Sequence, residues 1–211
     1  DSLKTRFFTN ISHEFRTPLT LLLGPINDLR QRHPTDMLYQ VMYRNANRLQ
    51  SLIGQLLELA KLDAGELQLD KQPGNLVDDI RIWIASFESL AQSRGITLSL
   101  TQNRPQQWKL YDADKLEKIV TNLISNALKF TPAGGNVQVD VLYHETRSVT
   151  IYVRDTGVGI APDQVKNIFD RFYQADDSQQ RGYEGTGIGL ALVKELVTAM
   201  KGQIRDRKSV V

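Results

Sequence analysis

Residues 7–19 read FFTNISHEFRTPL and place a histidine and an acid side by side, His13 and Glu14. A neutral imidazole carries a nucleophilic nitrogen near physiological pH, and a carboxylate that accepts its other N–H offsets the charge that develops during attack. We interpret His13 as a candidate nucleophile and Glu14 as its partner. Thr17 follows four residues later and shares a helix face with His13. For a lone His-Glu pair the simpler interpretation is a solvated helical histidine, so the rest of the chain must decide.

The residues around this stretch predict two long helices. Apolar residues recur three and four positions apart over residues 3–29 and again over residues 37–62, which is the period of a helix with one apolar face. Pro34 separates the two runs, Thr35 is the expected N-cap of the second helix, and Gly65 is its expected stop. Two helices cannot cover both apolar faces, so we expect a second copy to complete a four-helix bundle.

Composition narrows the classes of function. The 211 residues carry 26 Lys and Arg against 24 Asp and Glu, a net charge of +2, and the basic residues are scattered along the chain. This distribution does not favour a nucleic acid partner. The absence of cysteine excludes disulfides and thiolate metal sites. No apolar run approaches the roughly 20 residues that span a bilayer.

After residue 65 the pattern changes to shorter, mixed segments. We place the domain boundary there, with a helical hairpin at residues 1–65 and a second domain at residues 66–211. The second domain is predicted to be an α+β layer with a mostly antiparallel sheet. Its expected strands are residues 67–71, 96–101, 108–111, 137–143 and 149–155, and its expected helices are residues 75–94 and 112–130, with another that runs to residue 200.

One predicted helix carries a polar face that suits a phosphorylated ligand. Asn122 and Asn126 are four residues apart, and Lys129 follows three residues later, so all three project from one side. Amide carbonyls suit a hard cation such as Mg²⁺, and a lysine ammonium suits a phosphate. A solvated polar face would be the ordinary interpretation of these residues alone.

Two glycine-rich stretches follow. Residues 155–160 read DTGVGI after a predicted strand, and residues 185–190 read GTGIGL at the start of a predicted helix. Glycines let the backbone approach a ligand closely, and amides at a helix N-terminus can cradle phosphate. The Asp155 carboxylate can accept a hydrogen bond from an exocyclic amine. The glycines that we expect at the ligand are Gly157, Gly159, Gly185, Gly187 and Gly189.

The order of these features resembles the catalytic core of a sensor histidine kinase. Five motifs follow one another in the family's order over nearly the whole chain: an H-box at residues 13–19, an N-box at 122–130, a first glycine box at 155–159, an F-box at 169–172 and a second glycine box at 185–190. Residues 7–12 further resemble the hybrid two-component sensors of Bacteroides-type bacteria.

The resemblance implies a dimeric four-helix bundle for phosphotransfer, followed by a Bergerat-type α/β sandwich that binds ATP and Mg²⁺. In matching roles, His13 would attack the γ-phosphate while Glu14 holds its other nitrogen, and Thr17 would position water for dephosphorylation of a partner response regulator. In the second domain, Asn122 would ligate Mg²⁺, Asn126 and Lys129 would contact phosphates, and Asp155 would bind the adenine amino group.

In the family a lid over the nucleotide lies between the F-box and the second glycine box. We interpret Phe169 and Phe172 as its anchors. Gln174 stands where many relatives carry arginine, so Arg181 is the candidate substitute for a lid cation. The family also continues through two more strands after residue 204, so we expect a C-terminally truncated domain.

The implied function is autophosphorylation of His13, then transfer to an aspartate on a response-regulator receiver domain. The chain would be a homodimer and the cytoplasmic portion of a membrane-anchored bacterial sensor, with membrane contact only through upstream segments. One alternative is an ATP-binding dimerisation scaffold or phosphatase with little kinase activity. An ATPase related to gyrase or Hsp90 shares the nucleotide motifs but leaves the His13 helix without a purpose.

Overall fold

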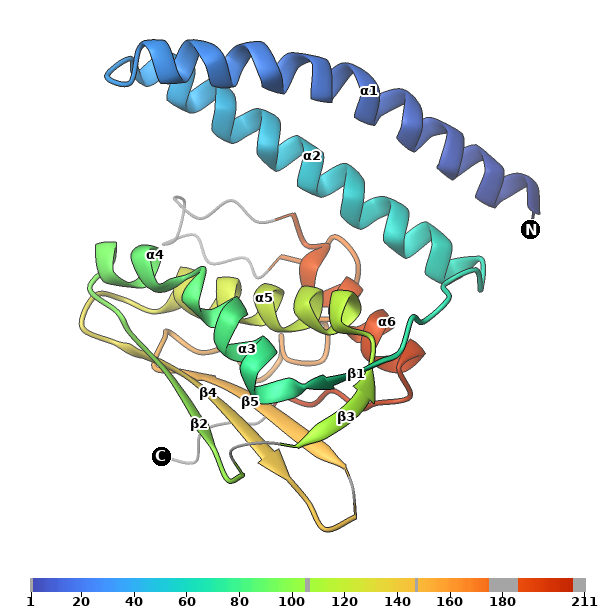
Figure 1. Ribbon diagram of the computed structural model, residues 1–211, viewed down its shortest axis with the longest axis vertical. Helices are drawn as coiled ribbons and strands as arrows, with labels where there is room; N and C mark the ends of the chain where they lie inside the picture. Colours follow the sequence, from blue (N-terminus) through green and yellow to red (C-terminus); the bar gives the residue numbers. More distant parts are fainter. Residues whose placement is uncertain (1, 105–106, 147, 175–185, 207–211) are drawn as a thin grey trace. The chain divides into compact units, whose positions relative to one another are not determined.

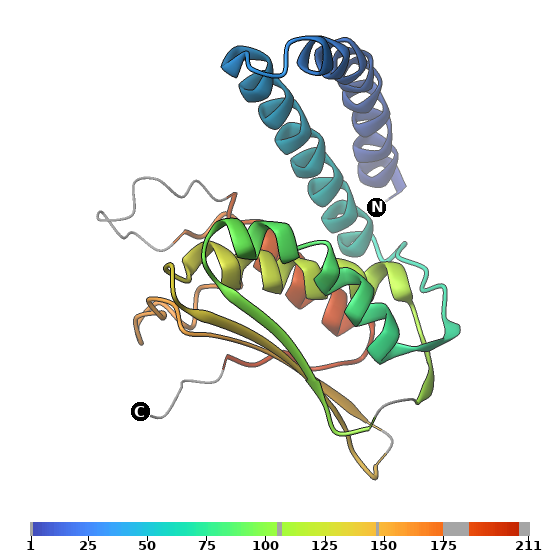
Figure 2. The same ribbon diagram turned by 60° about the vertical axis from the view of Figure 1, so that its left-hand side comes forward.

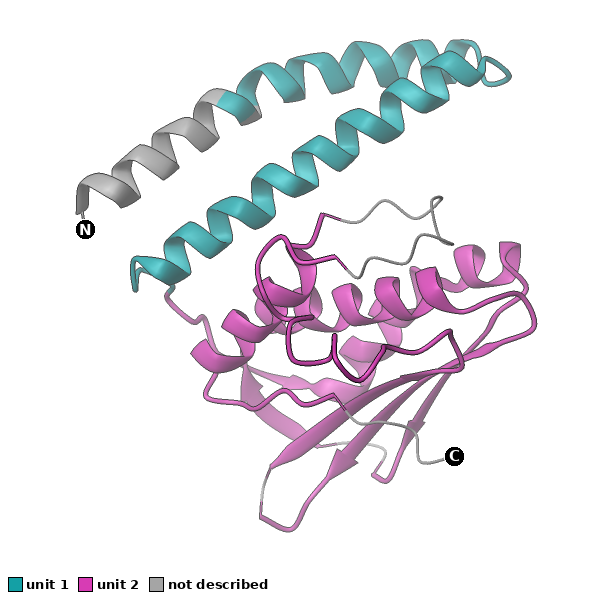
Figure 3. Cartoon of the chain, turned by 180° about the vertical axis from the view of Figure 1, so that it is seen from behind, with its two compact units in different colours: residues 1–67 teal, residues 68–211 magenta. Residues whose placement is uncertain are grey.

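The computed structural model describes residues 2–104, 107–146, 148–174 and 186–206; in the first helix it describes the side chains of Phe15 and of Thr17 onward. The chain forms two compact units, Asp1–Leu67 and Gln68–Val211 (Figure 3). Across the described ranges, none of the helices combines the length and the apolar character needed to cross a membrane.

The first unit is an antiparallel helical hairpin of α1 (Ser2–Arg32) and α2 (Met37–Asp63) (Figure 1). The prediction that Thr35 caps α2 is wrong. Asp36 is the N-cap, because its backbone is extended and its Oδ1 accepts a hydrogen bond from Leu38 N at 2.8 Å. Gly65 has a φ of +68°, which confirms the predicted stop just beyond α2.

The hairpin leaves much of its apolar surface uncovered. Leu19 and Leu59 are buried, with exposures of 6% and 4%. By contrast, Leu21 is 70% exposed and Leu22 is 58% exposed, and several more leucines of both helices are also exposed. An apolar surface of this extent is typical of a protein interface. The four-helix bundle with a second copy stays a prediction.

The second unit packs helices on one face of a sheet (Figures 1 and 2). Its elements are β1 (Gln72–Asn75), α3 (Leu76–Ala85), α4 (Glu88–Ser93), β2 (Thr97–Gln102), β3 (Trp108–Tyr111), α5 (Ala113–Phe130), β4 (Asn136–Tyr143), β5 (Val149–Asp155) and α6 (Gly189–Ala199). β2 runs parallel to β4, and β4 runs antiparallel to β5, whereas β1 and β3 form a separate antiparallel pair. The predicted fold class, a helical hairpin followed by an α/β layer, is confirmed.

Two local predictions in this unit are wrong. The single helix expected over residues 75–94 is two helices, because Ser86 Oγ donates to Trp83 O at 2.6 Å and Phe87 N donates to Ile84 O at 2.9 Å, which ends α3. The strand expected at residues 67–71 lies instead at β1. Two of the three strand pairs are antiparallel, as predicted, and the pairing of β2 with β4, which joins residues about 40 positions apart, is parallel.

The core fixes the orientation of α5. Val120, Ile124 and Leu128 lie one helical turn apart and are fully buried, in the same cluster as alternate valines of β4. The buried Asp112 carboxylate caps this helix at Lys115 N and also accepts from Asp70 N. With its apolar face held in the core, α5 must present its polar face on the other side.

Two isoleucine-to-alanine substitutions in α3 should separate the effect of burial on stability from the effect of helix propensity. Ile80 is 0% exposed and Ile82 is 67% exposed, and both lie in α3. We expect Ile80→Ala to lower the free energy of unfolding by about 3 kcal/mol, because it removes buried methyl groups and leaves a cavity. Ile82→Ala should change it by less than about 0.5 kcal/mol. Urea unfolding of both variants measures the difference, and equal losses would contradict this packing.

Candidate functional site

The polar face of α5 is shaped by a hydrogen bond within the helix. Asn122 Nδ2 donates to Lys118 O at 2.7 Å, which orients the amide. Asn126 and Lys129 are half-buried on the same helix, and the Lys129 ammonium lies 4.8 Å from the centroid of the Phe130 ring. The structure thus places the two amides and the ammonium along one side of α5, as the spacing predicts.

The second glycine box touches this face directly. Gly189 begins α6, and a Cβ added to it would lie 2.8 Å from Asn122 Oδ1. A side chain at residue 189 would therefore displace the Asn122 amide, and glycine lets the start of α6 approach it. Thr186 Oγ1 accepts a hydrogen bond from Ile188 N at 3.3 Å and shapes the turn before the helix. Amides at this end of α6 carry the partial positive charge of a helix N-terminus.

The first glycine box packs against the other end of α5. A Cβ on Gly157 would lie 2.6 Å from Phe130 O, so the loop backbone rests on the carbonyl end of the helix. Asp155 Oδ1 accepts from Gly157 N at 2.9 Å, and Val158 N donates to Phe130 O at 3.4 Å. The exposed Asp155 carboxylate therefore organises its own loop. Sequence reasoning assigned this residue to ligand binding alone and missed the turn.

Thr156 is a further residue that sequence reasoning missed. Its Oγ1 accepts a hydrogen bond from Asn136 N at 2.9 Å and ties the first glycine box to the start of β4. A Cβ on Gly135 would lie 2.8 Å from the same hydroxyl. The signal in the sequence is the Gly134-Gly135 pair immediately before a strand, which marks a close backbone approach.

The F-box meets the second glycine box through the backbone. Phe172 N donates to Gly187 O at 2.8 Å, and a Cβ on Gly187 would lie 2.6 Å from the Phe172 carbonyl carbon. Both residues have positive φ, 63° at Phe172 and 66° at Gly187. Phe172 is 65% exposed, and Phe169 is partly buried. Arg171 of the same box pairs with Glu195 of α6 at 3.8 Å.

Contacts between motifs thus join α5, both glycine boxes and the F-box in the second unit. Gly159 lies in the first of these loops with a φ of +74° and open space where a side chain would stand. Arg181 and Gly185 lie outside the described residues. His13 and Glu14 lie in α1, where their side chains are outside the described set, and Thr17 is exposed on the same helix.

Family comparisons match both units. The His Kinase A (phospho-acceptor) domain family matches residues 3–65. The family of histidine kinase-, DNA gyrase B- and HSP90-like ATPases matches residues 111–210. The first match contains His13, and the second contains α5 and both glycine boxes.

Curated relatives are histidine kinases. The chain is 38% identical to hybrid signal transduction histidine kinase D of Dictyostelium discoideum, over 97% of this chain and 14% of that protein. It is 37% identical to the sensor histidine kinase TmoS of Ectopseudomonas mendocina, over 97% of this chain and 21% of the relative. The chain therefore spans less than a quarter of either protein.

Solved histidine kinases share the fold. Full-length ShkA in complex with AMPPNP superposes with a TM-score of 0.77 at 31% identity, over 93% of this chain and 41% of that one. ThkA in complex with the response regulator protein TrrA gives a TM-score of 0.61 at 19% identity, over 93% of this chain and 55% of that one. Because its identity is low, the likeness to ThkA shows a shared fold alone.

The backbone approach at Gly187 makes a testable prediction for stability. We expect Gly187→Ala to lower the free energy of unfolding by about 3 kcal/mol or more, because positive φ and a clash with the Phe172 backbone add together. Gly134→Ala is the matched control, since Gly134 has a φ of +84° but no atom within 4 Å of an added Cβ. It should cost only about 1 kcal/mol. Similar losses in urea unfolding would show that the contact is unimportant.

The two family matches fall on the two structural units of the chain. The helical hairpin corresponds to the phospho-acceptor domain, and the α/β unit corresponds to the ATPase domain. The chain belongs to the histidine kinase family, as a core in which a His Kinase A (phospho-acceptor) domain precedes a histidine kinase-, DNA gyrase B- and HSP90-like ATPase domain.

Proposed function

We propose that this core binds Mg-ATP, phosphorylates itself on His13 and passes the phosphoryl group to an aspartate of a response-regulator receiver domain. One observation carries the proposal: α5 contacts both glycine boxes, the second through the Asn122 side chain at Gly189 and the first through the Phe130 carbonyl at Gly157. These contacts place amides, an ammonium and backbone N–H groups around one region of the second unit. Such groups neutralise and position phosphates, which is most of what phosphoryl transfer requires.

The residues present fit a nucleotide with a bound Mg²⁺. ATP supplies a transferable γ-phosphoryl group, and Mg²⁺ commonly needs only one or two protein ligands beside the phosphates. Because Asn122 Nδ2 is engaged by Lys118 O, its Oδ1 is the atom suited to a cation. Asn126, Lys129 and the glycine-box amides would hold phosphates. The exposed Asp155 carboxylate would accept from the adenine amino group, and the F-box aromatics and Arg181 would cover the nucleotide. The AMPPNP complex of ShkA supports the binding of a nucleotide.

His13 would be the phospho-acceptor. One ring nitrogen forms a bond to the γ-phosphorus as the bond to the bridging oxygen breaks and ADP leaves, while Glu14 holds the proton on the other nitrogen. His13 and the nucleotide residues belong to different units, so the reaction requires a domain movement about residues 63–67. In this proposal, residues 1–65 and 66–211 are the two functional domains that move relative to each other.

Two further assignments concern partners. The exposed leucines of α1 and α2 would pair with a second copy as a four-helix bundle. Exposed Thr17 would position water for dephosphorylation of a receiver domain, the partner that the family resemblance implies. An origin in a Bacteroides-type hybrid sensor, cytoplasmic and anchored through upstream segments, rests on the family resemblance alone.

Labelling with γ-labelled ATP and Mg²⁺ tests the proposal. We expect protein-bound label that is labile in acid and stable in base, as phosphohistidine is, and its complete loss in His13→Gln. ATP affinity should be the same in both proteins. ATP binding without label in the unaltered protein would favour the scaffold or phosphatase alternative, and label that survives in His13→Gln would exclude His13 as the acceptor.

Asn122→Asp tests the metal assignment. The added negative charge should repel the nucleotide phosphates, and the lost hydrogen bond to Lys118 O should release the side chain from the position that suits Mg²⁺, so labelling of His13 should slow by roughly 100-fold. Asn45→Asp is the matched control, because Asn45 Nδ2 donates in the same way to Val41 O at 2.9 Å but lies in α2. Initial rates of labelling compare the two, and a normal rate in Asn122→Asp would count against Asn122 as a ligand.

A further inference from the structure

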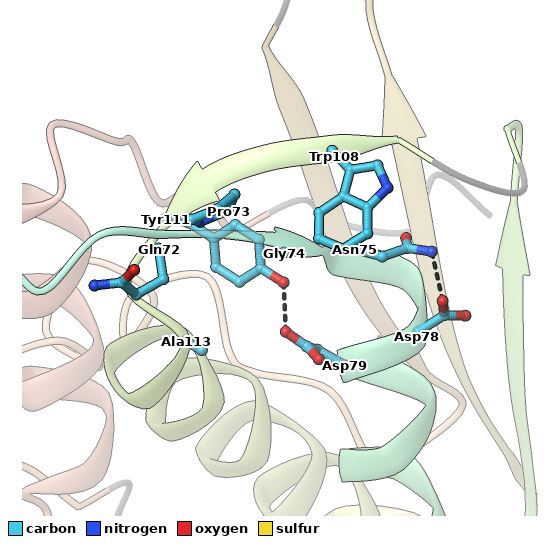
Figure 4. Close-up of a pocket in the computed structure, with 9 residues that line it drawn as sticks. All are labelled: Gln72, Pro73, Gly74, Asn75, Asp78, Asp79, Trp108, Tyr111 and Ala113. Atoms are coloured by element: carbon cyan, nitrogen blue, oxygen red, sulfur yellow. Dashed lines mark hydrogen bonds between the residues drawn. The ribbon is translucent and has the colours of Figure 1, made fainter.

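A hollow of about 450 Å³ lies in the second unit among residues that the proposed function does not use (Figure 4). It opens where the pair of strands β1 and β3 meets the start of α3. We call it the Trp108 hollow. The residues that give it its chemistry are Gly74, Asn75, Asp78, Asp79, Trp108 and Tyr111.

The Trp108 hollow carries uncompensated negative charge. Asp78 forms an ion pair with Arg81 at 2.9 Å, but this pair is about half exposed to solvent. Asp79 accepts a hydrogen bond from the Tyr111 hydroxyl and, among the described residues, has no cation paired with it. Burial raises the pKa of Tyr111, and its hydrogen bond to Asp79 raises it further. The phenol therefore stays neutral as a donor, and the Asp79 charge remains.

An acceptor without a donor lies beside these acids. Asn75 Nδ2 donates to Asp78 Oδ2, which fixes the amide. Asn75 Oδ1 is buried and has no hydrogen-bond partner in the described part of the chain. This oxygen is closed to solvent, so a ligand does not reach it, and the hydrogen bond from Asn75 Nδ2 holds the Asp78 carboxylate in place. The site thus favours a positive charge.

An exposed aromatic ring completes the set. Trp108 is directly opposite Asn75 in the register of β1 and β3, and it is 72% exposed. Figure 4 shows its indole beside the Asn75 side chain at the mouth of the hollow. The face of an indole attracts a cation placed over it, and a guanidinium group also stacks on it through its own plane.

We propose that the Trp108 hollow binds a guanidinium group, carried either by a small molecule or by an arginine side chain of a protein partner. A guanidinium group can stack on Trp108 and neutralise Asp79. An ammonium group offers no plane for stacking. A metal ion fits less well, because the described residues contain no cluster of three His, Asp or Glu side chains suited to one. This proposal does not depend on kinase activity.

The two tryptophans of the chain provide a direct measurement. Trp83 is 8% exposed and serves as an internal reference for Trp108. The amide of N-acetylarginine is titrated into ¹⁵N-labelled protein at constant ionic strength, and the indole N–H signals are followed by NMR. We expect a saturable shift at Trp108 with little change at Trp83, and an affinity at least fivefold higher than for the amide of N-acetyllysine.

Two variants and one control define the site. Asp79→Asn should weaken binding by about tenfold, because it removes the unpaired charge. Trp108→Ala, at an exposed position that folding does not require, should weaken it similarly when the Gly74 amide is followed instead. Glu88→Gln removes an acid in the first turn of α4, away from the hollow, and should leave the affinity unchanged. Thermal melting checks that each variant is folded.

Titration with a peptide that carries arginine between two leucines distinguishes a small-molecule ligand from an arginine side chain of a protein partner. Affinity at least tenfold above that of the free amide would identify an arginine side chain of a protein partner, and equal affinity would identify a small molecule; both results support the site. The proposal is overturned by the absence of a saturable Trp108 shift with either ligand. Equal binding of the lysine amide, or unchanged affinity in both folded variants, would overturn it as well.

Discussion

The second unit depends on close backbone contact between α5 and the two glycine boxes. A side chain at Gly157 would meet the carbonyl that ends α5, and one at Gly189 would meet the Asn122 amide. A third contact of this kind joins Gly187 to Phe172. A Cβ at any of these three positions would displace a neighbouring atom, and glycine permits the close approach. The same contacts bring backbone amides to the polar face of α5.

The core makes this arrangement possible. Buried Val120, Ile124 and Leu128 hold α5 over the sheet, and the Asn122 amide of its opposite face is oriented from within the helix. The residues of α5 proposed to bind the nucleotide therefore lie on a packed helix. The proposed acceptor His13 belongs to a separate unit, so the proposed chemistry and nucleotide binding would be divided between two compact bodies. With this division, movement of one domain relative to the other would control the phosphotransfer reaction.

The sequence predicts this fold well where periodicity and caps act locally. The strands β4 and β5 and the capped helix α5 lie within a residue or so of their predicted bounds. The break of α3 at Ser86 and the cap at Asp36 were missed, because both depend on which of several competing side-chain hydrogen bonds forms. The parallel pairing of β2 with β4 is a long-range choice that no local pattern contains. For the site, the motifs supply the candidate residues. Only the structure shows that Asp155 and Thr156 also shape the loop.

The most direct test of this account is an NMR titration of glycine-¹⁵N-labelled protein with AMPPNP and Mg²⁺. The chain has 14 glycines, which makes the spectrum simple to follow. The account predicts that the amide signals of Gly157, Gly159, Gly187 and Gly189 shift together as the nucleotide binds. Gly24 and Gly54, in α1 and α2, provide reference signals from the helical hairpin. Binding without shifts at the glycine boxes would contradict the claim that their contacts with α5 form the nucleotide site.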